Sequence, residues 1–319
     1  MNDTRPNLFI VGAPKCGTTS LYEYLRAHPD VFFPFDEKRY ARTKEPNHFC
    51  PELGITDEHS IKDRAEYLDL YRGGADATWR GDASVYHLLS ATAAERIKQF
   101  SPHARILIAL RPPVEMMRSY HGELLRHQHE DIADFHAAVD ASEDRRKGLR
   151  IPARSGVPHC LDYFAISRFA EQVERYLDVF GEASVKVVLL EDLAAEPART
   201  YRDILAFLGV DESFAPTFSV HNERPRRGAT ERAITFLYQH FGIKQAAQLL
   251  LPHARRRQLL SLIRRIDRDE IAADARDAQL AQACRADVQR LSKLTGRDLG
   301  HWQPGAAHGL SRRAQPRGP

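Results

Sequence analysis

The feature that most constrains the fold is the stretch "NLFIVGAPKCGTTSLYEYL", residues 7–25. Its apolar run, residues 7–13, is short and ends in a glycine turn, which predicts a buried parallel strand. Helical periodicity follows in residues 18–28, with Thr18 or Thr19 expected as the N-cap. A strand, a glycine loop and a helix in this order direct free backbone N–H groups at an anion. This segment therefore predicts an anion-binding loop in an α/β fold.

Two more apolar runs, residues 105–111 and 185–193, predict further buried strands. Helical patterns lie between and after them, at residues 91–99, 114–127, 166–180 and 198–208. Strands that alternate with helices predict a P-loop-like open parallel sheet flanked by helices. A chain of 319 residues can bury a sizeable core, and we expect one domain over residues 1–305.

Three segments fall outside this alternation. Residues 128–158, rich in His, Arg and Asp, are expected to form an irregular or partly helical excursion over the surface. Such a loop is often a lid or a substrate-binding element, and a plain surface insertion is an equal alternative. Residues 229–300 are expected to form a helical C-terminal part, in which the arginines of residues 253–270 mostly lie on a solvated helix face. Residues 306–319 are expected to be a disordered tail.

Composition excludes some classes of protein. With 46 Lys and Arg against 43 Asp and Glu, the net charge of +3 argues against a general nucleic-acid binder. The chain has no run of 18 apolar residues, which predicts no membrane span, and its first residues lack an apolar signal segment, so a cytoplasmic location is expected. Four scattered cysteines, Cys16, Cys50, Cys160 and Cys284, predict free thiols rather than a zinc site or disulfides.

The glycine loop departs from a Walker A loop, G-x-x-x-x-G-K-[ST]. Gly12 and Gly17 have the right spacing, but Thr18 stands where the lysine belongs, and Lys15 lies inside the loop. A magnesium-dependent kinase or NTPase also needs a strand that ends in an aspartate. The candidate is "VVLLED", which ends at Asp192 and is better interpreted as the turn before a helix. The loop therefore favours an anion site without a metal.

A second anion site is predicted at the end of the strand "RILIALR". Arg111 stands at its carboxyl end, where ligands of open α/β sheets bind. A guanidinium there suits a phosphate group. Ser119 follows two helical turns later, so Lys15, the loop N–H groups, Arg111 and Ser119 could bind two anionic groups.

These motifs resemble the sulfotransferases that use 3'-phosphoadenosine 5'-phosphosulfate (PAPS). The first loop of that family reads roughly G-x-x-K-[SGC]-G-T-[ST] and holds the 5'-phosphosulfate, and "GAPKCGTTS" is similar to it. The resemblance implies that this group is bound by Lys15, Cys16, Gly17, Thr18, Thr19 and Ser20. The likeness extends to about residue 228, roughly two-thirds of the chain.

The resemblance also implies a site for the 3'-phosphate of the donor. The family signature L-R-[DN]-P-x-x-R-x-x-S is similar to "LRPPVEMMRS", which keeps Arg111 and Ser119 but has methionines near the second arginine. "RPRRG" resembles the late basic element of the family and implies contacts from Arg227 and Gly228. Phe169 stands where the family usually has a tyrosine near the adenine.

For the chemistry, the resemblance implies that Lys15 stabilises the departing 5'-phosphate oxygen in a loose transition state, with no metal. Carbohydrate-type members have a catalytic glutamate in a K-E-P-x-x-F element, and "TKEPNHF" makes Glu45 the candidate base. "GDASVYHL" resembles their E-K-T-P-x-Y element, but Ala83 replaces its lysine. The residues expected on the substrate side are His48, Ser84 and His87, although a lone histidine is more often structural.

The implied reaction is sulfuryl transfer from PAPS to a hydroxyl group of a carbohydrate, a glycolipid or a small natural product. The expected partner is this small-molecule or glycan acceptor, whose identity is open, as is the oligomeric state. Two alternatives stay open. One is a magnesium-dependent nucleotide kinase or NTPase, and the other is a non-catalytic nucleotide-binding module, for which Ala83 is the hint.

Overall fold

The computed structural model describes residues 4–218 and 275–303. Several sequence predictions lie outside these ranges. They concern Arg227 and Gly228, the helix face of residues 253–270, and the tail of residues 306–319.

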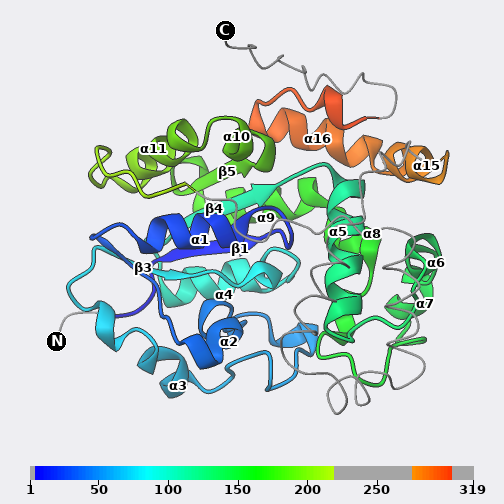
Figure 1. Cartoon of the computed structure of the whole chain (residues 1–319), viewed down its shortest axis with the longest axis horizontal. Helices are drawn as coiled ribbons and strands as arrows, with labels where there is room; N and C mark the ends of the chain where they lie inside the picture. Colours follow the sequence, from blue (N-terminus) through cyan, green and yellow to red (C-terminus); the bar gives the residue numbers. More distant parts are fainter. Residues whose placement is uncertain (1–3, 219–274, 304–319) are drawn as a thin grey trace, which may run out of the picture. The chain divides into compact units, whose positions relative to one another are not determined.

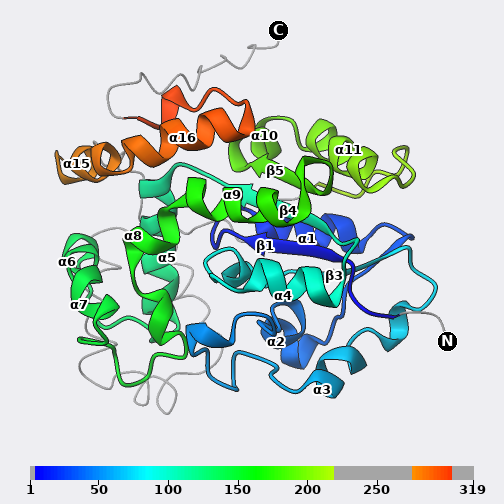
Figure 2. The ribbon, with the colours of Figure 1, turned by 180° about the vertical axis from the view of Figure 1, so that it is seen from behind.

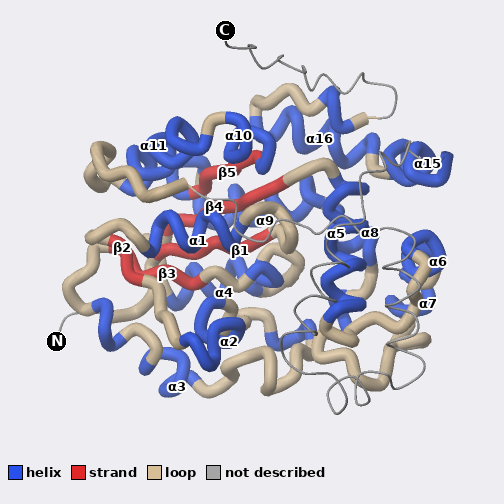
Figure 3. Tube along the Cα trace, viewed as in Figure 1, coloured by secondary structure: helices blue, strands red, loops and turns tan. Residues whose placement is uncertain are grey.

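The described part of the chain contains one five-stranded sheet in the order β2-β3-β1-β4-β5 (Figure 3). Every neighbouring pair is parallel. The strands are β1 (Leu8–Gly12), β2 (Val31–Phe32), β3 (Trp79–Asp82), β4 (Arg105–Leu110) and β5 (Val185–Leu189). Strand β1 is central and fully buried, as its apolar run requires. The predicted α/β fold with an open parallel sheet flanked by helices is confirmed.

Helices cover both faces of this sheet, with α1 on one face and α9 on the other (Figures 1 and 2). The longer helices are α1 (Thr18–Arg26), α4 (Ala93–Phe100), α5 (Pro113–Arg126), α9 (Phe169–Phe180), α11 (Pro197–Leu208), α15 (Ala275–Ala283) and α16 (Arg285–Thr295). The shorter ones are α2 (Tyr40–Lys44), α3 (Arg64–Asp69), α6 (Phe135–Asp140), α7 (Ser142–Arg146), α8 (Tyr163–Ser167) and α10 (Leu190–Ala195). Helix α16 buries Val288 and Leu291, and its Asp287 accepts hydrogen bonds from the Ala170 N–H of α9 (3.2 Å).

Two strands were not predicted, and one prediction was too long. Strand β3 reads "WRGD", which has no apolar run, and β2 has only two residues, too few for an alternation of period two. Only pairing with neighbours, Trp79 with Val31 and Gly81 with Leu8, makes them strands. Strand β5 ends at Leu189 instead of residue 193, because helix α10 begins at Leu190.

The excursion of residues 128–158 is partly helical, as predicted, and contains α6 and α7. It does not lie wholly over the surface, because its inner side reaches the core. Glu130 and Arg145 are buried and form a two-bond ion pair at 2.5 Å. The Tyr163 hydroxyl donates to the same carboxylate at 2.9 Å. The charge of Arg145 predicts an exposed side chain, but the residue is buried because it pairs with Glu130, 15 residues earlier in the chain.

This ion pair gives a stability prediction. Arg145→Met should lower the free energy of unfolding by about 3–5 kcal/mol, because Glu130 is left buried and charged without its partner. The control, Lys147→Met, breaks an exposed pair with Glu143 and should cost less than about 1 kcal/mol. Urea denaturation followed by circular dichroism measures both values. Equal destabilisation by the two substitutions would contradict the assignment.

Candidate functional site

The loop between β1 and α1 depends on a left-handed turn. Gly17 precedes the helix with a φ of 87°, and a Cβ there would lie 2.7 Å from the Leu190 side chain. Glycine is therefore favoured mainly by this backbone conformation, since the close Leu190 atom is the movable end of a side chain. The expected N-cap at Thr18 or Thr19 is wrong, since Gly17 is the N-cap and no side chain caps the helix. The first N–H groups of α1 thus stay without a side-chain partner and can face an anion.

Lys15 lies where three elements meet. Its ammonium contacts Glu123 Oε2 of α5 at 2.9 Å, and its carbonyl oxygen accepts a hydrogen bond from Arg111 Nη1 at 3.3 Å. Arg111 follows β4 and pairs with Glu115 at 2.6 Å. Its Nε is buried and has no hydrogen-bond partner in the described ranges. The fold therefore brings the lysine of the loop beside the arginine of the predicted second anion site.

The other residues of the predicted donor site differ in exposure. Cys16, Thr18, Ser20 and Ser119 are buried, whereas Lys15, Gly17 and Thr19 are partly exposed. Burial raises the pKa of the Cys16 thiol to about 12, although Arg111 acts in the opposite direction. Cys16 therefore stays protonated at neutral pH and has the properties of a small loop residue.

Glu45 is connected to the loop through a buried lysine. Helix α2 ends at Lys44, whose ammonium donates to Thr19 Oγ1 at 3.1 Å and to Glu45 Oε1 at 2.7 Å. The Lys44 side chain is 5% exposed and that of Glu45 is 26% exposed. Sequence reasoning gave no role to Lys44, although it was part of the K-E-P triplet that pointed to Glu45. The structure places it between the candidate base and the anion-binding loop.

Ser84 and His87 do not face solvent in this structure. Ser84 Oγ accepts a hydrogen bond from the Asn47 N–H at 2.9 Å, and His87 Nε2 accepts one from the Phe49 N–H at 3.3 Å. Both side chains are fully buried. Burial, with a smaller contribution from nearby His48, lowers the pKa of His87 to about 3. In this structure both residues hold the segment that follows Glu45 against the chain that follows β3, and their contact with the acceptor stays a prediction.

His48 also has structural contacts. Its Nδ1 lies 2.7 Å from the Ile61 carbonyl oxygen, and its ring stacks on Tyr67 with centroids 4.2 Å apart. The Tyr67 hydroxyl donates to Asp82 at 2.8 Å at the end of β3. Next to it, the Ala83 N–H donates to the Lys44 carbonyl oxygen at 3.1 Å. The backbone of Ala83 thus holds the segment that contains Glu45. A substrate contact by His48 stays a prediction.

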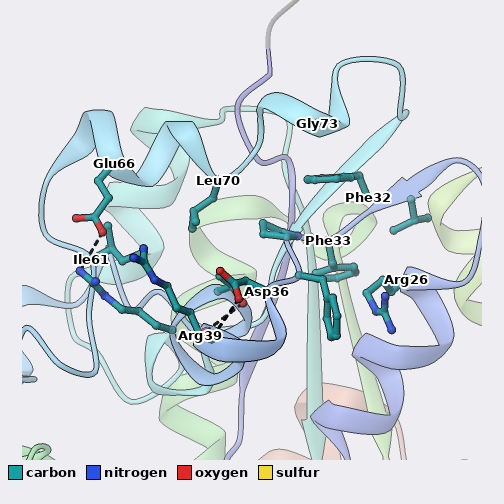
Figure 4. A pocket seen from close by; sticks show the side chains of 14 residues that line it. Arg26, Phe32, Phe33, Asp36, Arg39, Ile61, Glu66, Leu70 and Gly73 are labelled. Carbon is teal, nitrogen blue, oxygen red and sulfur yellow. Dashed lines mark hydrogen bonds and ion pairs between the residues drawn. The ribbon is translucent and has the colours of Figure 1, made fainter.

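A pocket of about 580 Å³ lies beside α2 (Figure 4). Figure 4 shows Phe32 and Phe33 on one side of it and Glu66 and Arg39 on the other. Its lining also includes Arg42, which pairs with Glu66 at 3.0 Å. The lining contains neither the glycine loop nor Glu45, so this pocket is separate from the residues gathered around Lys15.

Comparison with known proteins decides the family. The model described as "Sulfotransferase family" matches residues 6–214, which include the loop, Glu45, Arg111 and the whole sheet. The chain belongs to the sulfotransferase family. A solved sulfotransferase from Alicyclobacillus acidocaldarius is 32% identical, with a TM-score of 0.62, over 93% of this chain and 98% of that one.

Curated members of the sulfotransferase family are more distant. Carbohydrate sulfotransferase 15 of Homo sapiens is 23% identical over 259 residues, which cover 64% of this chain and 44% of that protein. The bifunctional heparan sulfate N-deacetylase/N-sulfotransferase 1 of Mus musculus is 27% identical over 215 residues, 65% of this chain and 22% of that protein. This chain therefore spans less than half the length of these relatives.

The described residues contain neither a cluster of metal-binding side chains nor a helix that could span a membrane. No three or more His, Cys, Asp and Glu side chains in residues 4–218 and 275–303 are grouped so that they could hold a metal ion. In the same part of the chain, every helix falls short of the length and apolar character that a membrane span needs.

The buried imidazole of His87 predicts a pH dependence of stability. The pKa of His87 is lowered in the folded state, so the unfolded chain takes up the proton first as the pH falls. The contribution of the neutral, buried His87 to the free energy of unfolding is complete above about pH 6.5. It declines by about 1.4 kcal/mol per pH unit toward pH 3. His87→Gln should remove this part of the decline in urea titrations between pH 6.5 and 4. His103→Gln, at an exposed histidine, is the control, and identical slopes for both variants would contradict the prediction.

Proposed function

We propose that the chain transfers the sulfuryl group of PAPS to a hydroxyl group of a saccharide acceptor. The observation that carries this proposal is the meeting of Lys15, Arg111 and the Lys44–Glu45 pair around one glycine loop. Membership of the sulfotransferase family supports PAPS as the donor. The names of the relatives, a carbohydrate sulfotransferase and a heparan sulfate sulfotransferase, support a saccharide as the acceptor.

The residues present fit the donor. The N-terminus of α1 has no capping side chain, and the loop before it contains Gly17, so N–H groups of residues 17–20 and Lys15 would hold the 5'-phosphosulfate. Arg111 would hold the 3'-phosphate, and its unpartnered Nε is consistent with an additional ligand. Ser119 belongs to the same sequence motif as Arg111 but is buried in this structure. A contact between Ser119 and the 3'-phosphate therefore requires a change of conformation. Contacts from Arg227 and Gly228 stay predictions from the sequence.

The proposed reaction has one transfer step. The acceptor oxygen attacks the sulfur atom, the bond from sulfur to the bridging 5'-phosphate oxygen breaks, and its electron pair stays on the phosphate. The Lys15 ammonium stabilises that charge. Glu45 takes the proton of the acceptor hydroxyl, and the products are a sulfate ester and 3'-phosphoadenosine 5'-phosphate. Lys44 binds Glu45 Oε1, and among the described residues none binds Oε2, which leaves that oxygen for the acceptor.

The alternative of a magnesium-dependent kinase or NTPase receives less support. Its candidate carboxylates at the end of the "VVLLED" segment have structural partners. Glu191 Oε1 lies 2.8 Å from Trp302 Nε1 and 2.7 Å from His301 Nε2, and Asp192 pairs with Arg297 at 2.6 Å. These contacts attach α10 to the C-terminal segment.

The alternative of a non-catalytic module is opposed by the retained Lys15 and Glu45. The cytoplasmic location and the lack of a nucleic-acid partner stay predictions.

Substitution of Lys15 and Glu45 tests the proposal. Lys15→Ala should lower kcat by about 100-fold or more, because the charge on the leaving oxygen loses its partner. Glu45→Gln should lower kcat by roughly 10²–10⁴-fold and leave the affinity for 3'-phosphoadenosine 5'-phosphate unchanged, because only proton removal is affected. Transfer of labelled sulfuryl groups to a panel of saccharides measures kcat, and calorimetry measures the affinity.

The matched controls are Lys38→Ala and Glu37→Gln, which change exposed residues of the segment before α2. Both should behave like the wild type. Magnesium-dependent ATP binding that a chelator abolishes, together with no affinity for 3'-phosphoadenosine 5'-phosphate, would replace the proposal with the kinase alternative. Retained transfer in Glu45→Gln would remove Glu45 from the role of base.

A further inference from the structure

The ammonium of Lys15 is held by a carboxylate that no motif pointed to. Glu123 Oε2 lies 2.9 Å from Lys15 Nζ and 2.5 Å from Arg126 Nη1, and Oε1 lies 3.3 Å from His127 Nε2. The side chains of Lys15 and Glu123 are 20% and 30% exposed. Glu123 lies on α5, one helical turn after Ser119.

Glu123 is negatively charged at neutral pH. Its partial burial by itself would raise its pKa, but the hydrogen bonds of His127 and Lys15 outweigh this effect and hold the pKa well below its usual range. Both of its oxygens are occupied by cationic or imidazole groups, which makes it a weak proton acceptor. The role of base therefore remains with Glu45, whose Oε2 has no partner within the described residues.

A fixed negative charge at this place opposes donor binding. The donor carries several negative charges at neutral pH, and a carboxylate in contact with the lysine that should bind them lowers its affinity. Removal of this carboxylate would thus strengthen binding. The contact of Glu123 with the Lys15 ammonium indicates a different advantage of this carboxylate, which is to fix the position of that ammonium.

The advantage follows from the chemistry of lysine. The ammonium is a compact charge at the end of a flexible four-carbon chain, and it has three N–H donors. One N–H bound to Glu123 restricts the ammonium to one region, and two donors remain for the oxygen of a ligand. The backbone of Lys15 is itself restricted, with a φ of 63°. The backbone of Lys15 in the loop and the carboxylate of Glu123 on α5 together therefore define the position of the ammonium.

We propose that Glu123 is a positioning residue that holds the Lys15 ammonium for the transfer step and lowers donor affinity in return. This inference rests on the proposed function, because it assigns Lys15 to the leaving oxygen. It predicts that rate and affinity change in opposite senses when the carboxylate is removed. A carboxylate with a purely structural role would lower both or neither.

Two substitutions of Glu123 separate charge from position. Glu123→Gln removes the charge and should lower kcat by about 10- to 100-fold, because Lys15 loses its restraint. It should also tighten the binding of 3'-phosphoadenosine 5'-phosphate by roughly two- to tenfold. Glu123→Asp keeps the charge on a shorter side chain, so it should lower kcat and leave the affinity close to that of the wild type.

The controls address the other partners of the carboxylate. Arg126→Gln removes a partner of the same oxygen and should leave kcat unchanged, since Arg126 is 47% exposed and lies at the end of α5. In a Lys15→Ala background, Glu123→Gln should have no further effect on kcat, because the two residues act as one unit. Calorimetry with 3'-phosphoadenosine 5'-phosphate and the turnover of PAPS with acceptor measure these quantities, and thermal denaturation checks that each variant folds.

The outcomes distinguish this inference from the proposed function. A wild-type chain that binds and turns over PAPS, with Glu123→Gln equal to it or weaker in both affinity and rate, would overturn the inference alone. Additive losses in the double variant would do the same. A wild-type chain with no affinity for 3'-phosphoadenosine 5'-phosphate would overturn the proposed function and, with it, the role given to Glu123. Opposite changes in rate and affinity would support both.

Discussion

The left-handed turn at Gly17 is the constraint on which the rest of the site depends. It lets the chain leave the buried strand β1 and enter α1 without a side chain between the loop and Leu190. The N–H groups of the first helical turn stay without a capping side chain, and Lys15 contacts Glu123 of α5. Thr19 is placed within reach of Lys44 by the same turn. The residues of the proposed donor site and the candidate base are thus arranged around one backbone conformation.

The charges around this turn are paired before any ligand binds. Lys15 contacts Glu123, Arg111 contacts Glu115, and Lys44 contacts Glu45. A paired charge in a partly buried site costs less to desolvate than an isolated one, and it keeps a defined direction. The proposed reaction uses this arrangement twice: Lys15 is held for the leaving oxygen, and Glu45 is held with one oxygen available for the acceptor.

Local patterns predicted much of the fold, and they were less informative about the site. The strands β1, β4 and β5 have apolar runs because both faces of a central parallel sheet are buried. Strand β3, with "WRGD", has no such run and exists only because β1 and β2 pair with it. The motifs around Lys15, Arg111 and Glu45 were visible because each is contiguous in sequence. Ser84 and His87 were also in a motif, but a motif does not reveal burial, and the structure places both inside the protein.

What the sequence by itself determined is the α/β fold class, the glycine loop with its displaced lysine and the resemblance to the sulfotransferases, because these are recorded in short segments with local periodicity or fixed spacing. Only the tertiary structure decided which side chains meet. The contact of Lys15 with Glu123 joins residues 108 positions apart, and that of Lys44 with Thr19 joins residues 25 apart. No local pattern encodes such pairs, since they arise from the packing of α1, α2 and α5 around the carboxyl edge of the sheet.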